Sequence, residues 1–503
     1  MNRRTFLKIL IAGGAGSLMN RSLGQRIPVL LGKGQALPPV QVNTYSSEIV
    51  LNSRRSYHGG YSGALSDQIL ANILWAASRA PVIGANRVIY VARPDNVYTY
   101  DPVAHEISLH LAGNHMSEPN CAFEVGVASD LAEDAGGALH YAHLAAHAFW
   151  TTTANQPSCC PKESAATNAN ATWNPALEIK IANCYGFMSS VSGITDELVA
   201  VSSNGSLPDP DTDGPIILEN ALSTLVYGEE FLDTELSLAE LSQLAWASYG
   251  NTPHTVMGSR AAITVASAVA YYYLTGRIYI VRSEGVERYH IRLPSGQVST
   301  RDHRIERVTD GDRRAQLRAA VTRLPQTAPD YFVYCAATAD RWQMIEAGYS
   351  AASALLQSAS LDLQGHCTAD FTTAERTAII NALGIPSTDL PLVIFSAGHV
   401  DTGISETDHD TAMRLNAAPN PFAGTTKVQY TLDNASRVMV KIHDRSGRLV
   451  KTLMDRTQYA GNHAVVWNGT DDHNAGVPAG IYYVIVKTGL IRRKIKLIKL
   501  QSQ

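Results

Sequence analysis

A short segment occurs twice in this chain, and the repeat constrains the fold more than any other feature of the sequence. LSDQILANILWAAS runs from Leu65 to Ser78, and LSLAELSQLAWASYG runs from Leu236 to Gly250. The offset is the same at the opening leucines and at the tryptophans (236 − 65 = 171; 246 − 75 = 171). The recurring apolar residues predict that each segment forms a helix. One chain therefore contains the same helix twice.

The repeat continues downstream of each helix as a predicted β-hairpin. Residues 87–110 and 277–300 each contain a strand, a turn of Gly, Asn or Asp residues, and a second strand ending in a tyrosine. These tyrosines, Tyr100 and Tyr289, are 189 positions apart (289 − 100 = 189). The second copy therefore has 18 more residues between its helix and its hairpin (189 − 171 = 18).

A third pair of segments shows that a whole domain is duplicated. EDAGGALHYAHLAAHAF at 133–149 parallels IEAGYSAASALLQSASL at 345–361, and both are predicted to form buried, Ala-rich helices that open after Ala-Gly. A period this long does not fit a solenoid of small repeats. We expect two α+β domains packed as a pseudo-symmetric pair.

Length and composition set the number of domains and the kinds of partner. A chain of 503 residues is expected to form two to four domains. Its net charge of −4 gives no electrostatic case for a nucleic-acid partner. Beyond the N-terminus no apolar run is long enough to span a membrane. The predicted divisions are a signal peptide 1–25, a first domain 45–201, a linker 202–215, a second domain 216–400, a linker 401–413 and a C-terminal domain 414–503.

The N-terminus has the order of an export signal. Arg3 and Arg4 precede Thr-Phe-Leu-Lys and a short apolar run, followed by small residues. Twin arginines in this setting resemble a Tat signal, which predicts a periplasmic, cell-surface or extracellular protein. An ordinary Sec signal or an N-terminal anchor is the alternative.

The C-terminal region changes character and predicts a small β-sandwich. Residues 426–433, 437–444 and 480–489 alternate apolar and polar side chains, as half-buried strands do. The patterns APNPF, GRLVKTL, HAVVWNGTD and VPAGIYYVIV resemble the FlgD-like Ig domain of secreted bacterial proteins. The resemblance implies a type IX secretion sorting domain whose partner is the secretion machinery. A plain accessory Ig module is the alternative.

The duplicated region resembles the nitroreductase superfamily, and its SagB-type dehydrogenase branch in particular. LSLAELSQLAWASYG, the hairpin segment EGVERY and the segment at 345–365 match the order of motifs in that family. ALGIPSTDLPLVIFSAGH at 382–399 matches the end of the domain. The match is good over most of 216–400 and looser over 45–150.

The resemblance implies FMN as cofactor and a fold of two tandem α+β domains that form an intramolecular pseudo-dimer. Family members bind FMN at a dimer interface, where one subunit supplies an Arg-Arg-Ser motif and the other a Pro-Ser-Ala segment. Here the first copy alone carries the arginines, and only the second carries the other segment, as Ala-Ser-Ala. One composite site is therefore expected. The residues implied to contact FMN are Arg54, Arg55, Ser56, Ala266, Ser267, Ala268 and Gly365.

The chemistry of these residues suits an anionic phosphate, although each has another interpretation. Two arginines can give charge-assisted hydrogen bonds to a phosphate group. Arg54 and Arg55 could instead be surface residues beside a helix, and Ala266 replaces the proline of the family. The tyrosines at 271–273 could stack on flavin, but core packing is favoured.

The sequence therefore predicts an exported, FMN-dependent oxidoreductase. It would pass a hydride from a small-molecule electron donor to an acceptor that the sequence does not identify, and no catalytic residue is named. The alternative is a secreted, non-catalytic binding or structural protein that keeps a degenerate nitroreductase scaffold.

Cysteine and histidine patterns are weaker. Six cysteines without a CxxC pair leave a disulfide open in an exported protein and predict no metal site. His140, His143 and His147 share one helical face, which could bind a metal. Because the segment is Ala-rich and lacks an HExxH pattern, core or interface histidines are favoured.

Overall fold

The computed structural model describes most of the chain in segments. These are residues 34–56, 61, 64–118, 120–149, 155–189, 207–214, 216–225, 227–267, 271–400, 415–432, 435–444, 449–472, 474–488 and 491–500. The predicted signal peptide, the linker 401–413 and Ala268 lie outside these residues. Among the described residues, no helix is long and apolar enough to cross a membrane.

The first half of the chain forms a seven-stranded antiparallel sheet with the order β1-β4-β3-β2-β5-β7-β6. Its strands are β1 (Gln35–Ala36), β2 (Arg87–Ala92), β3 (Asn96–Asp101), β4 (Glu106–Ala112), β5 (Phe123–Ser129), β6 (Asn155–Lys162) and β7 (Ile179–Ser189). The predicted hairpin downstream of the first helix is β2–β3.

The second half repeats this sheet. Its six antiparallel strands have the order β12-β11-β10-β13-β15-β14, which is the order of the first sheet without β1. The strands are β10 (Ile278–Arg282), β11 (Gly285–His290), β12 (Arg304–Asp310), β13 (Asp330–Ala336), β14 (Gln364–Thr368) and β15 (Leu390–Gly398). Two α+β units of one topology confirm the predicted duplication.

The helices repeat with the sheets, and their bounds keep the sequence offset. α2 and α6 begin 171 residues apart (218 − 47 = 171), as do α3 and α7 (238 − 67 = 171). The first half contains α2 (Ser47–Ser53), α3 (Asp67–Arg79), α4 (Ala132–Ala148) and α5 (Glu163–Thr172). The second contains α6 (Leu218–Ser223), α7 (Leu238–Tyr249), α8 (Arg314–Ala320), α9 (Arg341–Ser360) and α10 (Thr373–Leu383).

The Leu-Ser pair that opens both copies of the repeated segment begins a helix. Ser66 and Ser237 are the N-cap residues of α3 and α7, and each side chain accepts a hydrogen bond from a backbone N–H in the first turn. Such a cap satisfies a donor that the helix itself leaves without a partner. The leucines that precede both serines are buried.

The 18 extra residues of the second copy accompany a hairpin that the first copy lacks. β8 (Asn251–Val256) and β9 (Arg260–Ile263) pair antiparallel between α7 and β10. In the first half, only residues 80–86 separate α3 from β2, and they contain no strand. The hairpin therefore makes the two halves unequal.

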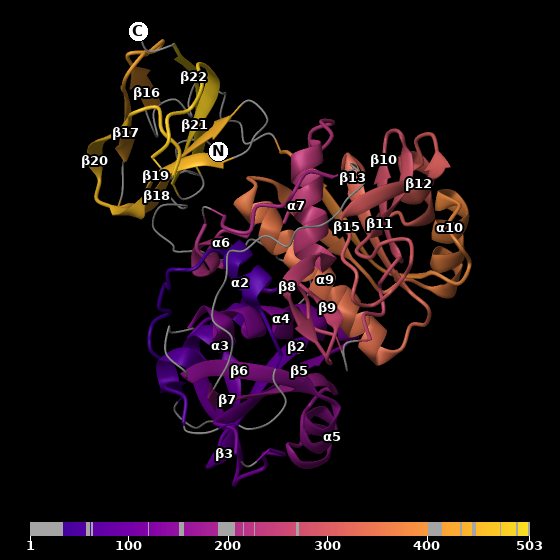
Figure 1. The fold of residues 1–503 in the computed structure, drawn as a ribbon. Helices are drawn as coiled ribbons and strands as arrows, with labels where there is room; N and C mark the ends of the chain where they lie inside the picture. Colours follow the sequence, from indigo (N-terminus) through magenta and orange to yellow (C-terminus); the bar gives the residue numbers. More distant parts are fainter. Residues whose placement is uncertain are drawn as a thin grey trace, which may run out of the picture. The chain divides into compact units, whose positions relative to one another are not determined.

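The two central helices, α4 and α9, pack against each other and join the halves (Figure 1). A side chain at Gly136 would collide with the carbonyl of Ile345, and one at Gly348 would collide with the carbonyl of Glu133. The two contacts are related by symmetry. On each helix, the carbonyl that meets the glycine of the other helix stands three residues before that helix's own glycine (136 − 133 = 3; 348 − 345 = 3). The repeated Ala-Gly thus permits a close and nearly symmetric helix contact.

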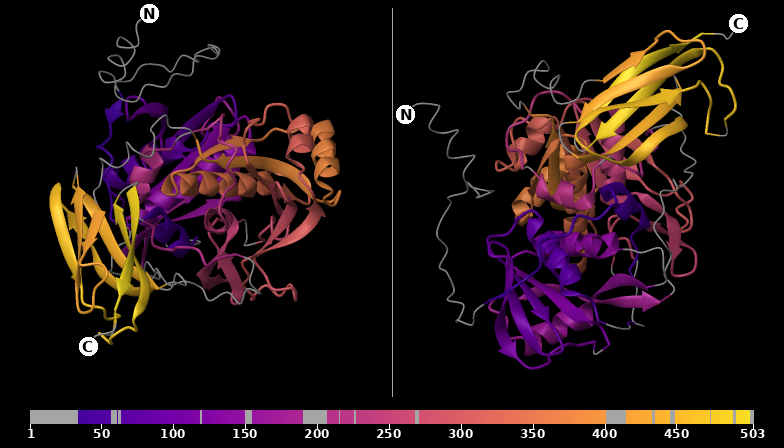
Figure 2. Two further views of the ribbon diagram at one scale, coloured as in Figure 1. Left: turned by 90° about the horizontal axis from the view of Figure 1, so that it is seen from above. Right: turned by 90° about the vertical axis from the view of Figure 1, so that its left-hand side faces the viewer.

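The C-terminal region forms the predicted β-sandwich. Its strands are β16 (Leu415–Ala418), β17 (Thr426–Leu432), β18 (Ser436–Asp444), β19 (Leu449–Gln458), β20 (Gly461–Trp467), β21 (Gly480–Thr488) and β22 (Ile491–Lys499). They make one sheet of order β16-β17-β20 and another of order β19-β18-β21-β22. The two sheets, yellow in Figure 2, enclose a core around Trp467, which is fully buried.

Candidate functional site

Arg54 joins the two halves of the duplicated region at the end of α2. It is the C-cap residue of this helix and is only 4% exposed. Its Nε donates to the carbonyl of Thr264 at 2.9 Å, and its Nη2 donates to those of Ile263 and Val265 at 2.8 and 2.7 Å. One guanidinium therefore bonds three consecutive carbonyls at the end of the β8–β9 hairpin.

The hairpin is held in place by the end of the second repeated helix. The N–H of Thr264 donates to Gly250 O at 2.9 Å, and its hydroxyl donates to Trp246 O at 3.2 Å. The indole N–H of Trp246 in turn donates to Asn251 O at 3.0 Å. The Trp-Ala end of the repeated segment thus positions the carbonyls that Arg54 bonds.

Ser267 lies two residues beyond Val265 and belongs to a buried polar network. Its Oγ accepts from the N–H of Tyr272 at 2.8 Å, and it also hydrogen-bonds the carboxyl group of Glu346 on α9. Glu346 Oε1 accepts from the hydroxyl of Tyr249 at 2.5 Å. Burial is the main cause that raises the pKa of Glu346 to about 7.

Histidines surround the arginine pair. His143 Nε2 donates to the carbonyl of Arg55 at 3.1 Å, and its ring stacks on that of His147 with 4.8 Å between centroids. Burial, aided by the charge of Arg54, lowers the pKa of His143 to about 3. Burial and then the charges of Arg55 and Arg54 lower the pKa of His254 on β8 to about 2. These imidazoles are neutral near pH 7.

The arrangement can attract an anion. Two guanidinium groups lie among histidines that add no positive charge of their own, and Arg55 is only partly buried. Ser56 Oγ accepts from Arg54 Nη1 at 3.3 Å, so its own proton can be donated to a ligand. Arg55 and Ser56 therefore fit a phosphate group, whereas most donors of Arg54 are used within the protein.

The predicted site residues separate into two groups. The hydrogen bonds of Arg54 bring it and Ser56 beside the segment that continues into Ala266, which is buried, and Ser267. Gly365 lies elsewhere, on β14, where its carbonyl accepts from Gly228 N at 3.1 Å and its Cα faces the ring of Phe395. Ala268 lies outside the described residues.

Gly365 lies beside the counterpart of the arginine segment in the second half. The offset of 171 places Leu225 at the position of Arg54 and Tyr227 at that of Ser56 (54 + 171 = 225; 56 + 171 = 227). Tyr227 forms an isolated bridge with Gly365, and its hydroxyl donates to Arg79 O at 3.3 Å. No arginine occupies this second segment.

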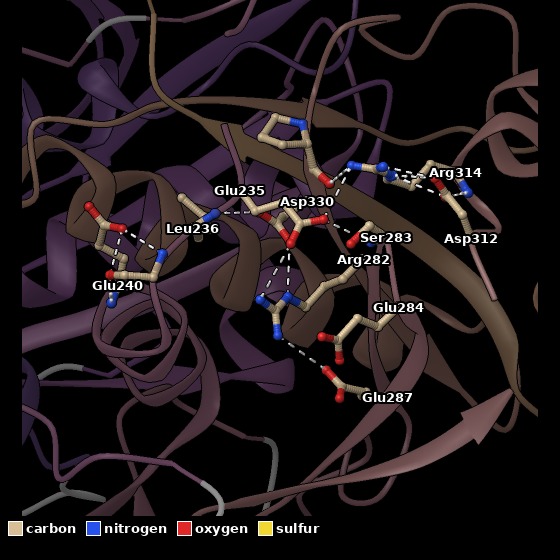
Figure 3. A network of polar contacts seen from close by, with 12 residues as sticks. Glu235, Leu236, Glu240, Arg282, Ser283, Glu284, Glu287, Asp312, Arg314 and Asp330 are labelled. Carbon is tan, nitrogen blue, oxygen red and sulfur yellow. Dashed lines mark hydrogen bonds and ion pairs between the residues drawn. The ribbon is translucent and has the colours of Figure 1, made fainter. Parts of the chain in front are cut away.

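An ionic network holds the start of α7. This is the end of the helix opposite to the one that contacts the β8–β9 hairpin, to which Arg54 bonds. Asp330 Oδ2 accepts from the N–H of Leu236 at 2.8 Å. The guanidinium of Arg282 forms ion pairs with three carboxylates (Figure 3). Its Nε lies 3.4 Å from Asp330 Oδ1, its Nη2 lies 3.8 Å from Glu235 Oε2, and its Nη1 lies 3.9 Å from Glu287 Oε2. Burial is the main cause that raises the pKa of Asp330 to about 6. These groups orient the helix that holds the hairpin.

Sequence reasoning missed Glu346, Tyr249 and His254. Glu346 stands in the Glu-Ala-Gly segment that was used to identify the helix, so its position was visible but its partners were not. The favoured interpretation of His140, His143 and His147 as core residues agrees with their complete or near-complete burial. Tyr272 is buried whereas Tyr271 is 61% exposed, so the tyrosine segment is not uniformly core.

Comparisons with known proteins identify the C-terminal domain directly. Residues 417–489 match the FlgD Ig-like domain family, which confirms the predicted class of that domain. No curated protein matches the chain.

Solved structures that resemble the chain include nitroreductases. A proposed nitroreductase from Anabaena variabilis is 12% identical and covers 69% of this chain and 93% of its own, with a TM-score of 0.48. An FMN-dependent nitroreductase from Clostridium difficile is 14% identical over 36% of this chain and 87% of its own, with a TM-score of 0.26. Nitroreductase A from Vibrio parahaemolyticus is 15% identical over 37% of this chain and 69% of its own, with a TM-score of 0.24. At these identities the likeness concerns the fold alone.

Proposed function

We propose that this protein is an exported, FMN-dependent oxidoreductase with one composite flavin site. The observation that carries the proposal is the set of three hydrogen bonds from Arg54 to the carbonyls of residues 263–265. They join the Arg-Arg-Ser segment of one half to the residues just before Ser267 in the other. The sequence resemblance divides its flavin-binding motifs between these same two segments.

The residues around Arg54 have distinct tasks in this proposal. Arg55 and Ser56 hold the phosphate of FMN, while Arg54 ties the two halves together and adds positive charge. Glu346 acts as a positioning residue, because it bonds Ser267 and the N–H of Leu274 (3.3 Å) and so fixes both ends of the segment between them. When bound, FMN supplies the hydride chemistry, and the chain supplies binding, orientation and a largely buried setting.

A binding protein without flavin is the second candidate function. It is favoured by the same guanidinium of Arg54, because the carbonyls of the protein occupy hydrogen-bond donors that a phosphate would otherwise use. In that case the duplicated domains form a scaffold whose ligand is not a flavin.

The absorption spectrum of the purified full chain separates the two candidates. Yellow protein that releases FMN, identified by mass spectrometry after denaturation, supports the oxidoreductase. The variant Arg55→Gln should lower FMN occupancy, whereas the matched control Leu225→Ala, in the second-half counterpart of the arginine segment, should keep full occupancy. Colourless protein that takes up no added FMN contradicts the proposal.

Export is a separate part of the proposal and has its own test. It is supported by Arg3 and Arg4 before an apolar segment and by the FlgD Ig-like domain. Replacing both arginines by lysine should retain the protein in the cytoplasm of a Tat-competent bacterium, and deleting residues 414–503 should stop it short of the cell surface. Export unchanged by the lysine variant contradicts the Tat route.

A further inference from the structure

Two cysteines and a glutamate meet inside the first sheet, away from the arginine pair. Cys121 lies two residues before the start of β5, Glu124 is on β5, and Cys184 is on β7. Strand register places Glu124 directly opposite Cys184. One ligand atom from each of the three residues lies within 4.8 Å of the other two, and no other such group of His, Cys, Asp or Glu occurs among the described residues.

The three side chains are withdrawn from water. Cys121 is 5% exposed, and Glu124 and Cys184 are 0% exposed. A carboxylate in such a place needs compensation for its lost hydration. Glu124 Oε1 receives it from Ser117, through N–H at 2.9 Å and Oγ at 2.7 Å, and from the N–H of Glu118 at 2.8 Å.

The other oxygen of this carboxylate has no such partner. Glu124 Oε2 is buried and accepts no hydrogen bond from the part of the chain that the structure describes. A buried acceptor left in this state is costly, which makes it unusual in a folded protein. The orphaned oxygen belongs to the same group that lies beside two thiols, so a cation at this place would satisfy it.

We propose that Cys121, Glu124 and Cys184 bind a Zn²⁺ ion. Cys184 Sγ lies 3.6 Å from Glu124 Oε1. Tetrahedral zinc with Zn–S of about 2.3 Å and Zn–O of about 2.0 Å separates sulfur and oxygen by about 3.5 Å, so the carboxylate is close enough to share an ion with this thiol once Oε2 is turned toward it. Thiolate ligands favour zinc over the oxygen-seeking Ca²⁺ and Mg²⁺.

Charge and protons balance in this site without a redox step. Binding displaces one proton from each thiol, and two thiolates with a carboxylate then face a divalent cation. The donors from Ser117 and Glu118 stabilise the remaining negative charge. The three protein ligands leave a fourth position for water or another ligand. The ion would fasten β5, β7 and the loop at Ser117 together. No spacing motif marks this cluster, because the cysteines are 63 residues apart in the chain (184 − 121 = 63).

Metal analysis of the full chain tests the site. Protein purified without chelator should contain about one zinc per chain, and metal-free protein should take up Co²⁺ with the charge-transfer absorption of cobalt bound to thiolate. Cys184→Ser and Glu124→Gln should each weaken zinc binding at least about 10-fold. Cys335→Ser is the matched control, because Cys335 is a buried strand cysteine outside the cluster, and it should keep the metal.

Peptide mapping of the wild-type chain under non-reducing conditions tests whether these cysteines form a disulfide instead of binding zinc. Cys121 and Cys184 should both be alkylated after zinc is removed. A disulfide between them would overturn the proposal, as would one between Cys184 and Cys160, its partner in strand register. Absence of zinc and of the cobalt–thiolate absorption would also overturn it. The wild-type measurements decide the matter even if a variant fails to fold.

Discussion

The two segments that follow α2 and α6 began as copies of one sequence and now differ in kind. The first carries Arg54, whose guanidinium bonds the carbonyls of residues 263–265 in the opposite half. The second carries Leu225 at that position, and residues 80–86, between α3 and β2, contain no counterpart of the β8–β9 hairpin. Arg54 from the first half and the β8–β9 hairpin from the second therefore meet at one place, and at the pseudo-symmetric place the described residues include a counterpart of neither. The difference shows that the two copies of the duplicated domain are not equivalent at this segment, which is the basis of the single flavin site that we propose.

The largest expected effect comes from removing the charged partner. Arg54→Ala leaves three buried carbonyls without their donors and should lower the free energy of unfolding by about 3–5 kcal/mol. Denaturant unfolding followed by circular dichroism measures the change. Leu225→Ala is the matched variant in the second half and should cost clearly less. Equal losses would show that Arg54 has no special task.

Glu346→Gln should change how stability depends on pH. Burial raises the pKa of this carboxyl in the folded protein to about 7, above its ordinary value of 4.5. The folded state then holds the proton more tightly, so the contribution of Glu346 to stability falls as pH rises from 4.5 to 7. The loss in the wild type is up to about 3 kcal/mol, and the glutamine variant lacks it. Parallel pH profiles for the two proteins would contradict the assignment.

The contact between α4 and α9 should respond symmetrically, unlike the two half-sites. Gly136→Ala and Gly348→Ala each force a methyl group against a carbonyl and should cost about 1–3 kcal/mol by thermal or denaturant unfolding. Because the two glycines have equivalent surroundings, their costs should agree within about 1 kcal/mol. A large cost at one glycine alone would show that the helix pair is not pseudo-symmetric.

Arg55→Gln is expected to act on the ligand more than on the fold. Loss of a charge-assisted hydrogen bond to phosphate should weaken FMN binding about 10- to 100-fold, as measured by fluorescence titration of the metal- and flavin-free chain. Arg318→Gln, on α8, is the control for removing one positive charge. If both variants bind FMN alike, Arg55 is not a phosphate ligand.

Much of the fold could be predicted because the repeated features act locally. Leu-Ser marks the start of a capped helix, and alternating apolar and polar residues mark strands; each effect depends on nearby residues. The same offset that revealed the duplication also located Leu225 and Tyr227 as the counterparts of Arg54 and Ser56.

The task of Arg54 could not be predicted, because it depends on which atoms the fold brings to it. The sequence shows a guanidinium and an expected phosphate, but the carbonyls of residues 263–265 carry no mark in their side chains. Glu346 was hidden for the same reason, since its partners Tyr249 and Ser267 come from distant segments. Gly365 was grouped with the arginines because the sequence could not show which half-site it faces.

The number of FMN molecules bound per chain tests the difference between the half-sites most directly. The full chain would be purified, saturated with FMN, freed of excess ligand, and analysed for flavin by absorbance and for protein by amino-acid analysis. One composite site predicts a ratio of one. A ratio of two would mean that the segment at Leu225 also binds flavin, and a ratio of zero would mean that neither does.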